Sequence, residues 1–132
     1  VCSSDLYFQM NLKNKVYSPK EVLAHLLIAS KEVIGESGKN LIDKLTSVFI
    51  KNIKNKDVLE KVNIKSLEKI KNYWGLSIGQ AIAYGYIVFS NLNFENKSLT
   101  EDEITNMFVF EMQIYSPDNA VEYVLYFFRL IT

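Results

Sequence analysis

Hydrophobic residues recur at three- and four-residue intervals along most of the chain, the spacing of one face of an α-helix. The first such segment begins at the sequence Ser18-Pro19-Lys20-Glu21, which combines a capping box with a proline in the first helical turn. We expect this helix to end near Gly35, and a second amphipathic helix to run from about Lys39 to Ile53.

The middle of the chain has a less regular pattern. Residues 55–57 are typical of a turn, and Val58 to Val62 indicate a short turn of helix. Ser66 is suited to cap a third long helical segment that continues through Trp74. The sequence therefore predicts a third helix across residues 66–74.

Small residues are concentrated between Tyr73 and Phe89. Two sets of them recur every four residues: Gly75, Gly79 and Ala83, and beside them Ser77, Ala81 and Gly85. On a helix they would form a band where a neighbouring backbone approaches closely, and a glycine-bent strand is the alternative. A phosphate-binding loop is disfavoured, because it needs a strand before the glycines and usually a lysine or hydroxyl residue at a fixed offset.

The C-terminal part carries two further helix starts. Thr100 and Glu103 form a capping box, flanked by Leu99 and Ile104 as a hydrophobic staple. The run MFVFEMQIY that follows alternates like a strand, but its start favours a helix. Ser116-Pro117 then opens a last helix, from about residue 118 to 131, which is apolar nearly all round. We expect it to be buried on most sides, at the centre of the fold or under a second subunit.

These elements predict an all-α protein, a compact single-domain bundle of five to six helices covering residues 10–132. An α+β fold with strands near 81–92 and 107–115 is the alternative. Residues 1–9 are interpreted as a remnant, because LYFQ resembles the core of a protease site that is used to remove purification tags. Cys2, the only cysteine, lies in that remnant. Without thiols or a long apolar run, we expect a cytoplasmic protein with no membrane segment.

Catalytic signatures are missing from the sequence. His25 is the only histidine and no nucleophile elbow is present, so we expect no enzyme, no metal site and no cofactor. His25 borders an apolar stripe and is interpreted as a boundary histidine with one polar contact. The consecutive acids 101–103 point about 100° apart on a helix, which suits a helix start better than a metal site.

Glu111 and Glu122 lie within apolar stretches of the last two predicted helices. We expect both to be partly exposed at the edge of the core. If either is buried it needs a polar partner, and the sequence offers Arg129, the only arginine, or a tyrosine hydroxyl.

Charge divides the chain into two unlike halves. Residues 10–71 contain 13 lysines and 7 acidic residues, whereas residues 72–132 contain two basic and 7 acidic residues. The lysine-rich region 51–71 could contact protein or nucleic acid. Interspersed acids and the lack of arginine favour an ordinary solvated surface over nucleic-acid recognition.

We therefore predict a non-enzymatic protein–protein interaction module: an adaptor, a small subunit or an inhibitor that docks on a larger complex. Homodimer formation is one further expectation. The candidate contact residues are the lysines and the aromatic residues of the last helix: Lys51, Lys54, Lys61, Lys65, Lys69, Tyr123, Tyr126 and Phe127. One alternative is a nucleic-acid-binding helical protein that uses region 51–71. Another is a sensor enclosing a small apolar ligand among the last helix and Tyr73, Trp74, Tyr84 and Tyr86.

Overall fold

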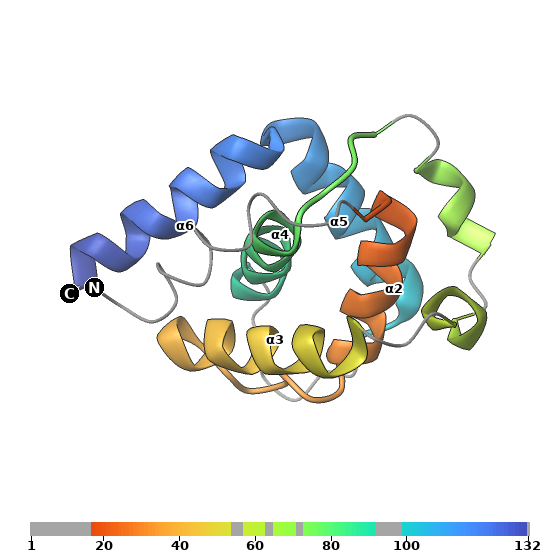
Figure 1. Ribbon diagram of the computed structural model, residues 1–132, viewed down its shortest axis with the longest axis horizontal. Coiled ribbons are helices and arrows are strands. Elements are labelled where there is room, and N and C mark those ends of the chain that lie inside the picture. The colour runs from red at the N-terminus through yellow and green to blue at the C-terminus, as the bar shows by residue number, and fades with distance from the viewer. Residues whose placement is uncertain (1–16, 54–56, 63–64, 71–72, 92–98, 132) are drawn as a thin grey trace.

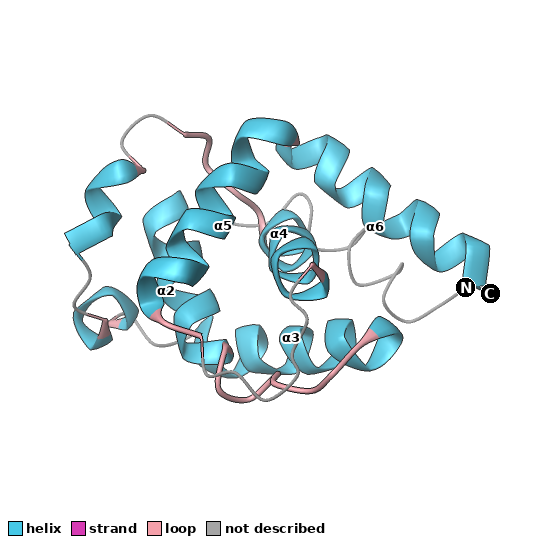
Figure 2. Ribbon diagram, turned by 180° about the vertical axis from the view of Figure 1, so that it is seen from behind, coloured by secondary structure: helices cyan, strands magenta, loops and turns pink. Residues whose placement is uncertain are grey.

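The computed structural model describes residues 17–53, 57–62, 65–70, 73–91 and 99–131 (Figure 1). Throughout this part of the chain the regular structure is helical, as Figure 2 shows by colour, so the predicted all-α fold is confirmed and the strand alternative is wrong. The elements are five α-helices and two 3₁₀ helices: α2 (Pro19–Ala29), α3 (Gly38–Ile53), η1 (Val58–Lys61), η2 (Lys65–Lys69), α4 (Ile78–Ser90), α5 (Glu101–Ile114) and α6 (Pro117–Ile131).

Helix α4 is the centre of the fold. Figure 1 shows it nearly end-on, with the other α-helices arranged around it, and it packs against α3, α5 and α6. Every residue from 81 to 89 is buried. The helix contains no charged residue, and a helix that is apolar on all sides is stable only when it is covered on all sides.

Helix α6 lies at the periphery instead, so the expectation of a central position within the chain was wrong, while coverage by a second subunit stays a prediction. Its inner face is formed by Ala120, Val121 and Val124, which are buried. Tyr123 and Tyr126 on the same helix are exposed. Because α4 already occupies the centre, the part of α6 whose side chains are described, up to Phe127, is buried on its inner face only.

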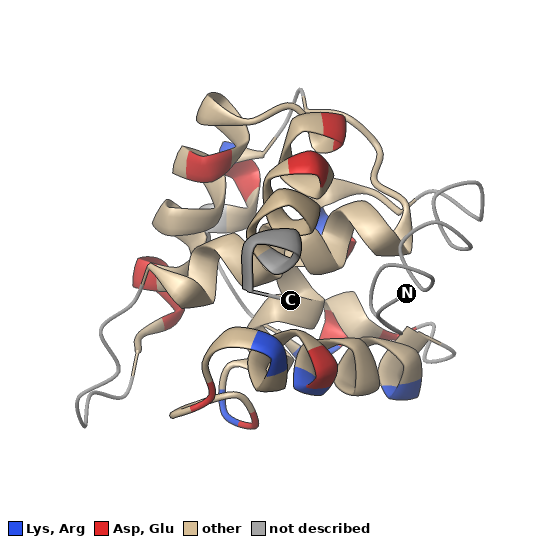
Figure 3. Ribbon diagram, turned by 90° about the vertical axis from the view of Figure 1, so that its left-hand side faces the viewer, with Lys and Arg blue, Asp and Glu red and all other residues tan. Residues whose placement is uncertain are grey.

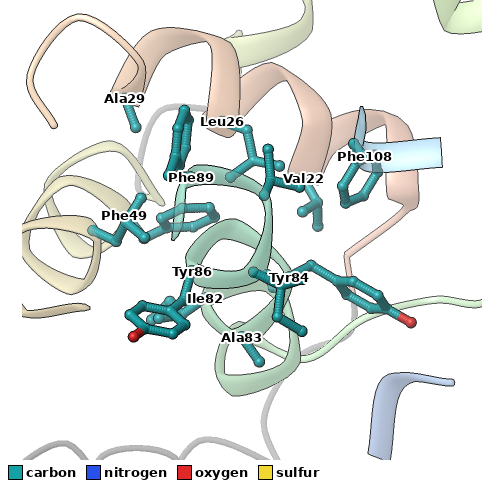
Figure 4. Packing of buried hydrophobic residues seen from close by; sticks show 14 of the residues in the cluster. Val22, Leu26, Ala29, Phe49, Ile82, Ala83, Tyr84, Tyr86, Phe89 and Phe108 are labelled. Carbon is teal, nitrogen blue, oxygen red and sulfur yellow. The ribbon is translucent and has the colours of Figure 1, made fainter. Parts of the chain in front are cut away.

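Close packing of small residues is confirmed at Gly85 on α4. A Cβ atom built there would lie 2.8 Å from Cδ2 of Leu26 on α2 and 3.5 Å from Cδ1 of Leu45 on α3. Gly85 therefore allows three helices to meet without a gap. Figure 4 shows the surrounding side chains of α2, α3 and α4, with Phe49 and Phe89 filling the space beside this contact.

The band of small residues is helical only from Ile78 onward, so Gly75 lies before α4. Ser77 caps it: the Ser77 hydroxyl accepts the Gln80 backbone N–H, and the Gln80 side chain accepts the Ser77 backbone N–H. This Ser-x-x-Gln capping box is visible in the sequence and was missed. The glycine before the cap belongs to the connection, not to the helix.

The predicted helix across residues 66–74 was also wrong. Its place is taken by the short helix η2, with Ser66 inside it, and residues 73–77 that follow are non-helical. Backbone pairing explains the extended path: the Tyr17 N–H donates to the Leu76 carbonyl at 2.6 Å, and the Leu76 N–H donates to the Tyr17 carbonyl at 2.7 Å. This pairing holds the start of α4 beside the start of α2.

Most other local predictions are confirmed. Ser18 and Glu21 form the capping box of α2, α3 matches its expected range, and η1 supplies the short helical turn. Helix α2 ends earlier than expected, at Ala29, and a turn leads to Gly35, which has a positive φ of 84°. The predicted turn at 55–57 lies mostly outside the described residues, as does the loop after Asn91.

Candidate protein-binding surface

Helix α5 presents a row of large apolar side chains to solvent. Thr100 caps the helix by accepting the Glu103 backbone N–H. The inner face, which includes Phe108 and Met112, is buried in the core. Phe110 and Ile114, one helical turn apart, are 57% and 54% exposed. Two large apolar residues exposed side by side make this face of α5 a candidate binding surface.

The corner between α5 and α6 is tied to the central helix. The Tyr84 hydroxyl on α4 donates to the backbone carbonyl of Tyr115, the residue that ends α5. Burial raises the pKa of Tyr84, so this hydroxyl keeps its proton as a donor. At the start of α6, the Gln80 side-chain amide donates to Asp118 Oδ1 at 3.1 Å. These two bonds hold the corner in one position relative to α4.

A shallow hollow of about 780 Å³ opens beside this corner. We call it the α5–α6 groove, and seven residues line it: Ile114, Tyr115, Asn119, Glu122, Tyr123, Leu125 and Tyr126. Tyr123 and Tyr126 are 42% and 63% exposed, and the rings of Tyr115 and Tyr123 are 5.4 Å apart between centroids. The groove thus combines three phenol rings with aliphatic surface and one carboxylate.

The groove lies in an acidic part of the molecule. Between residues 99 and 127 the sequence has six acidic residues and no lysine, arginine or histidine. Lysines are found instead on α3, across α4 from α6, where Figure 3 shows them in blue. The uneven charge of the sequence therefore corresponds only in part to different sides of the fold, because Lys69 in η2 lies beside α5.

The candidate contact residues are only partly brought together. Tyr123 and Tyr126 meet in the groove, whereas the Phe127 ring packs 6.0 Å from the ring of Tyr86. The lysines with described side chains are exposed and distributed over three elements: Lys51 on α3, Lys61 in η1 and Lys69 in η2. Lys69 donates to Asn106 Oδ1 on α5 at 3.2 Å. Lys54 and the side chain of Lys65 lie outside the described residues.

His25 is buried in the core, which corrects its interpretation as a boundary residue. Its side chain is 4% exposed and stacks on Phe49 with a centroid separation of 5.3 Å. Nδ1 is buried and has no hydrogen-bond partner in the described part of the chain. Burial lowers the pKa of His25, and the negative charge of Glu21 opposes this shift only in part. The neutral imidazole acts as a packing group.

Glu111 is also buried, which corrects the expectation of partial exposure. Its Oε1 accepts from Asn91 Nδ2 at 3.1 Å, so its polar partner among the described residues is the residue that follows α4. The side chain of Arg129 lies outside the described part. Burial raises the pKa of Glu111, and the bond from Asn91 opposes the shift. No local signal in the sequence connects two residues 20 positions apart. Glu122, in contrast, is exposed as expected.

The aromatic residues proposed for a ligand sensor are dispersed. Tyr84 is fully buried against Phe108, and Tyr86 is buried on α4, whereas Trp74 is exposed at the surface. Ligand sensing and nucleic-acid binding both stay predictions.

Among the described residues, no group of three histidine, cysteine or acidic side chains is arranged to hold a metal ion. Within the same ranges, no helix has the length and apolar character needed to cross a bilayer. Comparisons of the chain with known protein families, curated proteins and solved structures found no match.

Proposed function

We propose that this protein is a non-enzymatic interaction module that binds another protein through the α5–α6 groove. The observation that carries the proposal is the pair of exposed aromatic residues on α6, Tyr123 and Tyr126, which line the groove together with the exposed Ile114. Tyrosine is among the residues most enriched at the energetically important centres of protein interfaces. Its ring supplies apolar contact area and its hydroxyl supplies a hydrogen bond.

The hydrogen bonds that fix the α5–α6 corner to the central helix support this proposal. Hydrogen bonds from Tyr84 and Gln80 on the central helix reach both sides of the corner that forms it. A binding surface that is already ordered loses less conformational entropy when the partner arrives. The groove therefore has the rigidity that a docking surface needs, as well as the composition.

The charge of this region favours a different protein as the partner over a second copy of the chain. In a two-fold symmetric dimer each surface faces its own copy. Pairing through the groove would bring together two surfaces that each carry Glu122 and Asp118 and have no basic residue between 99 and 127. Like charges brought together across an interface are unfavourable.

Site-specific photocrosslinking tests the proposal. A benzoylphenylalanine replaces Phe110, which lies one helical turn along α5 from Ile114 of the groove. As a matched control it replaces the exposed Trp74, on another part of the surface. In lysate of the source organism, we expect the crosslinker at position 110 to form an adduct with the partner. An excess of wild-type protein should suppress this adduct, because the wild-type protein competes for the partner. An excess of the Tyr123→Ala/Tyr126→Ala variant should not suppress it. Equal suppression by both competitors, or the same adduct at Trp74, would contradict the proposal.

A further inference from the structure

The polar and aromatic side chains that α6 contributes to the α5–α6 groove lie on one face of the helix. Glu122 and Tyr126 are four residues apart on α6, as are Asn119 and Tyr123, so all four lie on the same helix face. All four also line the groove. A carboxylate thus lies beside the phenol rings, at the edge of an apolar hollow.

We propose that the groove takes an arginine-bearing apolar segment of the partner protein, an inference that rests on the proposed function. A guanidinium group is planar and weakly hydrated, so its face stacks on an aromatic ring while its edge donates two hydrogen bonds to a carboxylate. The adjacent Tyr126 ring and Glu122 carboxylate offer both partners at once. A lysine ammonium is a compact point charge and satisfies only one of these geometries well.

The charge balance of the groove supports a cationic guest. Glu122 is exposed and has no ion-pair partner among the described residues, and Asp118 lies one turn before it on α6. Burial raises the pKa of Tyr115, and the negative charge of Glu111 one turn earlier on α5 adds to this shift, so a carboxylate lies near this edge of the groove. An arriving cation would balance the negative charges of Glu122 and Asp118, whose potential would steer it toward the groove.

Apolar surface on both sides sets the rest of the guest's chemistry. Ile114 and Leu125 line the hollow, and the exposed Phe110 continues the apolar surface one turn back along α5. A segment that carries aliphatic side chains next to its arginine would cover this surface. A purely basic segment without them would leave the apolar part exposed.

The inference is tested with three fluorescently labelled peptides. All three carry leucines at the same helical spacing, and their charged positions are arginine in the first, lysine in the second and glutamate in the third. Fluorescence anisotropy measures their binding to the full chain. We expect the arginine peptide to bind about threefold to tenfold more tightly than the lysine peptide, because only the guanidinium stacks and pairs at once. The glutamate peptide should not bind. Equal affinities for arginine and lysine would overturn the inference.

Matched variants locate the binding. Glu122→Gln and Tyr126→Leu should each weaken the arginine peptide about threefold or more, since each removes one of the two interactions. Tyr126→Phe keeps the ring and should retain most of the affinity. Glu60→Gln on η1 removes a carboxylate elsewhere on the surface, and Trp74→Leu removes another exposed aromatic ring; neither should have an effect. Equal effects of Glu122→Gln and Glu60→Gln would refute the assignment.

The outcomes separate this inference from the proposed function. If no arginine preference is found but the Phe110 crosslink is still suppressed only by wild-type competitor, the groove binds protein and the assigned chemistry is wrong. If that crosslink also fails, both are wrong. Sedimentation equilibrium tests whether a second copy of the chain occupies the groove. If the wild-type protein is a dimer and Tyr126→Leu makes it a monomer, the occupant is a second copy and the arginine-bearing partner is wrong.

Discussion

Substitution of Gly85 by alanine tests whether the helices meet as closely as the structure shows. The new methyl group would lie 2.8 Å from Cδ2 of Leu26, well inside van der Waals contact, and 3.5 Å from Leu45 Cδ1. Leu26 and Leu45 are fully buried, so neither can turn into solvent. Overpacking of a core costs about 1–3 kcal/mol. Alanine regains about 1 kcal/mol over glycine within a helix. Gly85→Ala should therefore cost between about 0 and 2 kcal/mol.

The sharper result comes from the same change in a Leu26→Ala background. Leu26→Ala removes the clashing Cδ2 atom and should itself cost about 2–5 kcal/mol, because it leaves a cavity. In that background the methyl group of Gly85→Ala enters free space and retains its helical advantage, so it should stabilise the protein by about 1 kcal/mol. The two substitutions should thus show a coupling of about 1–3 kcal/mol. Leu26→Val, which also lacks Cδ atoms, serves as a milder background.

Urea denaturation followed by circular dichroism gives the free energy of unfolding of each variant, with an unchanged m-value as the criterion for comparison. Gly38→Ala is the control: Gly38 has a φ of 56° and no atom within 4 Å of the position that a Cβ would take, so alanine there is strained but contacts no neighbour. Its cost should be the same in both backgrounds. If Gly85→Ala also changes the unfolding free energy equally in both, the close contact does not exist.

Three further predictions concern buried polar groups. Glu111→Gln should increase the free energy of unfolding at pH 7, because burial raises the pKa of Glu111 in the folded state and makes its ionisation unfavourable there. This gain should vanish at acidic pH, where Glu111 is protonated in both the folded and the unfolded chain. His25→Phe should flatten the loss of stability that sets in as the pH falls below about 6.5, because the lowered pKa of His25 makes the unfolded chain take up the proton first. Urea titrations across pH measure both, and slopes of the opposite sign would refute them. Tyr84→Phe should cost about 1–2 kcal/mol and speed amide hydrogen exchange at the α5–α6 corner, because the Tyr115 carbonyl loses its buried donor; unchanged exchange there would contradict the anchoring role.

The sequence by itself determined where most helices begin. Ser18, Thr100 and the Ser116-Pro117 pair each act on backbone groups within four residues, so their effect can be read without knowing the rest of the fold. The cap at Thr100 also decided between helix and strand for the ambiguous run that follows it. The missed start at Ser77 belongs to the same class, since its Ser-x-x-Gln signal is local.

The tertiary structure decided which of these elements lies inside. The sequences of helices α4 and α6 are both strongly apolar, but a core of this size has room for one central helix. Helix α4 takes that place because its small Gly85 fits between α2 and α3. The outer position of α6 then exposes Tyr123 and Tyr126 and creates the α5–α6 groove.

Pairings between distant residues were likewise beyond the reach of the sequence. The Tyr17–Leu76 backbone bridge replaced a helix that local propensity favoured, and the Asn91–Glu111 bond made a carboxylate tolerable inside. Each depends on two segments meeting after the helices have packed. Local hydrogen bonding sets the elements, whereas burial of apolar surface, summed over the whole chain, sets their arrangement.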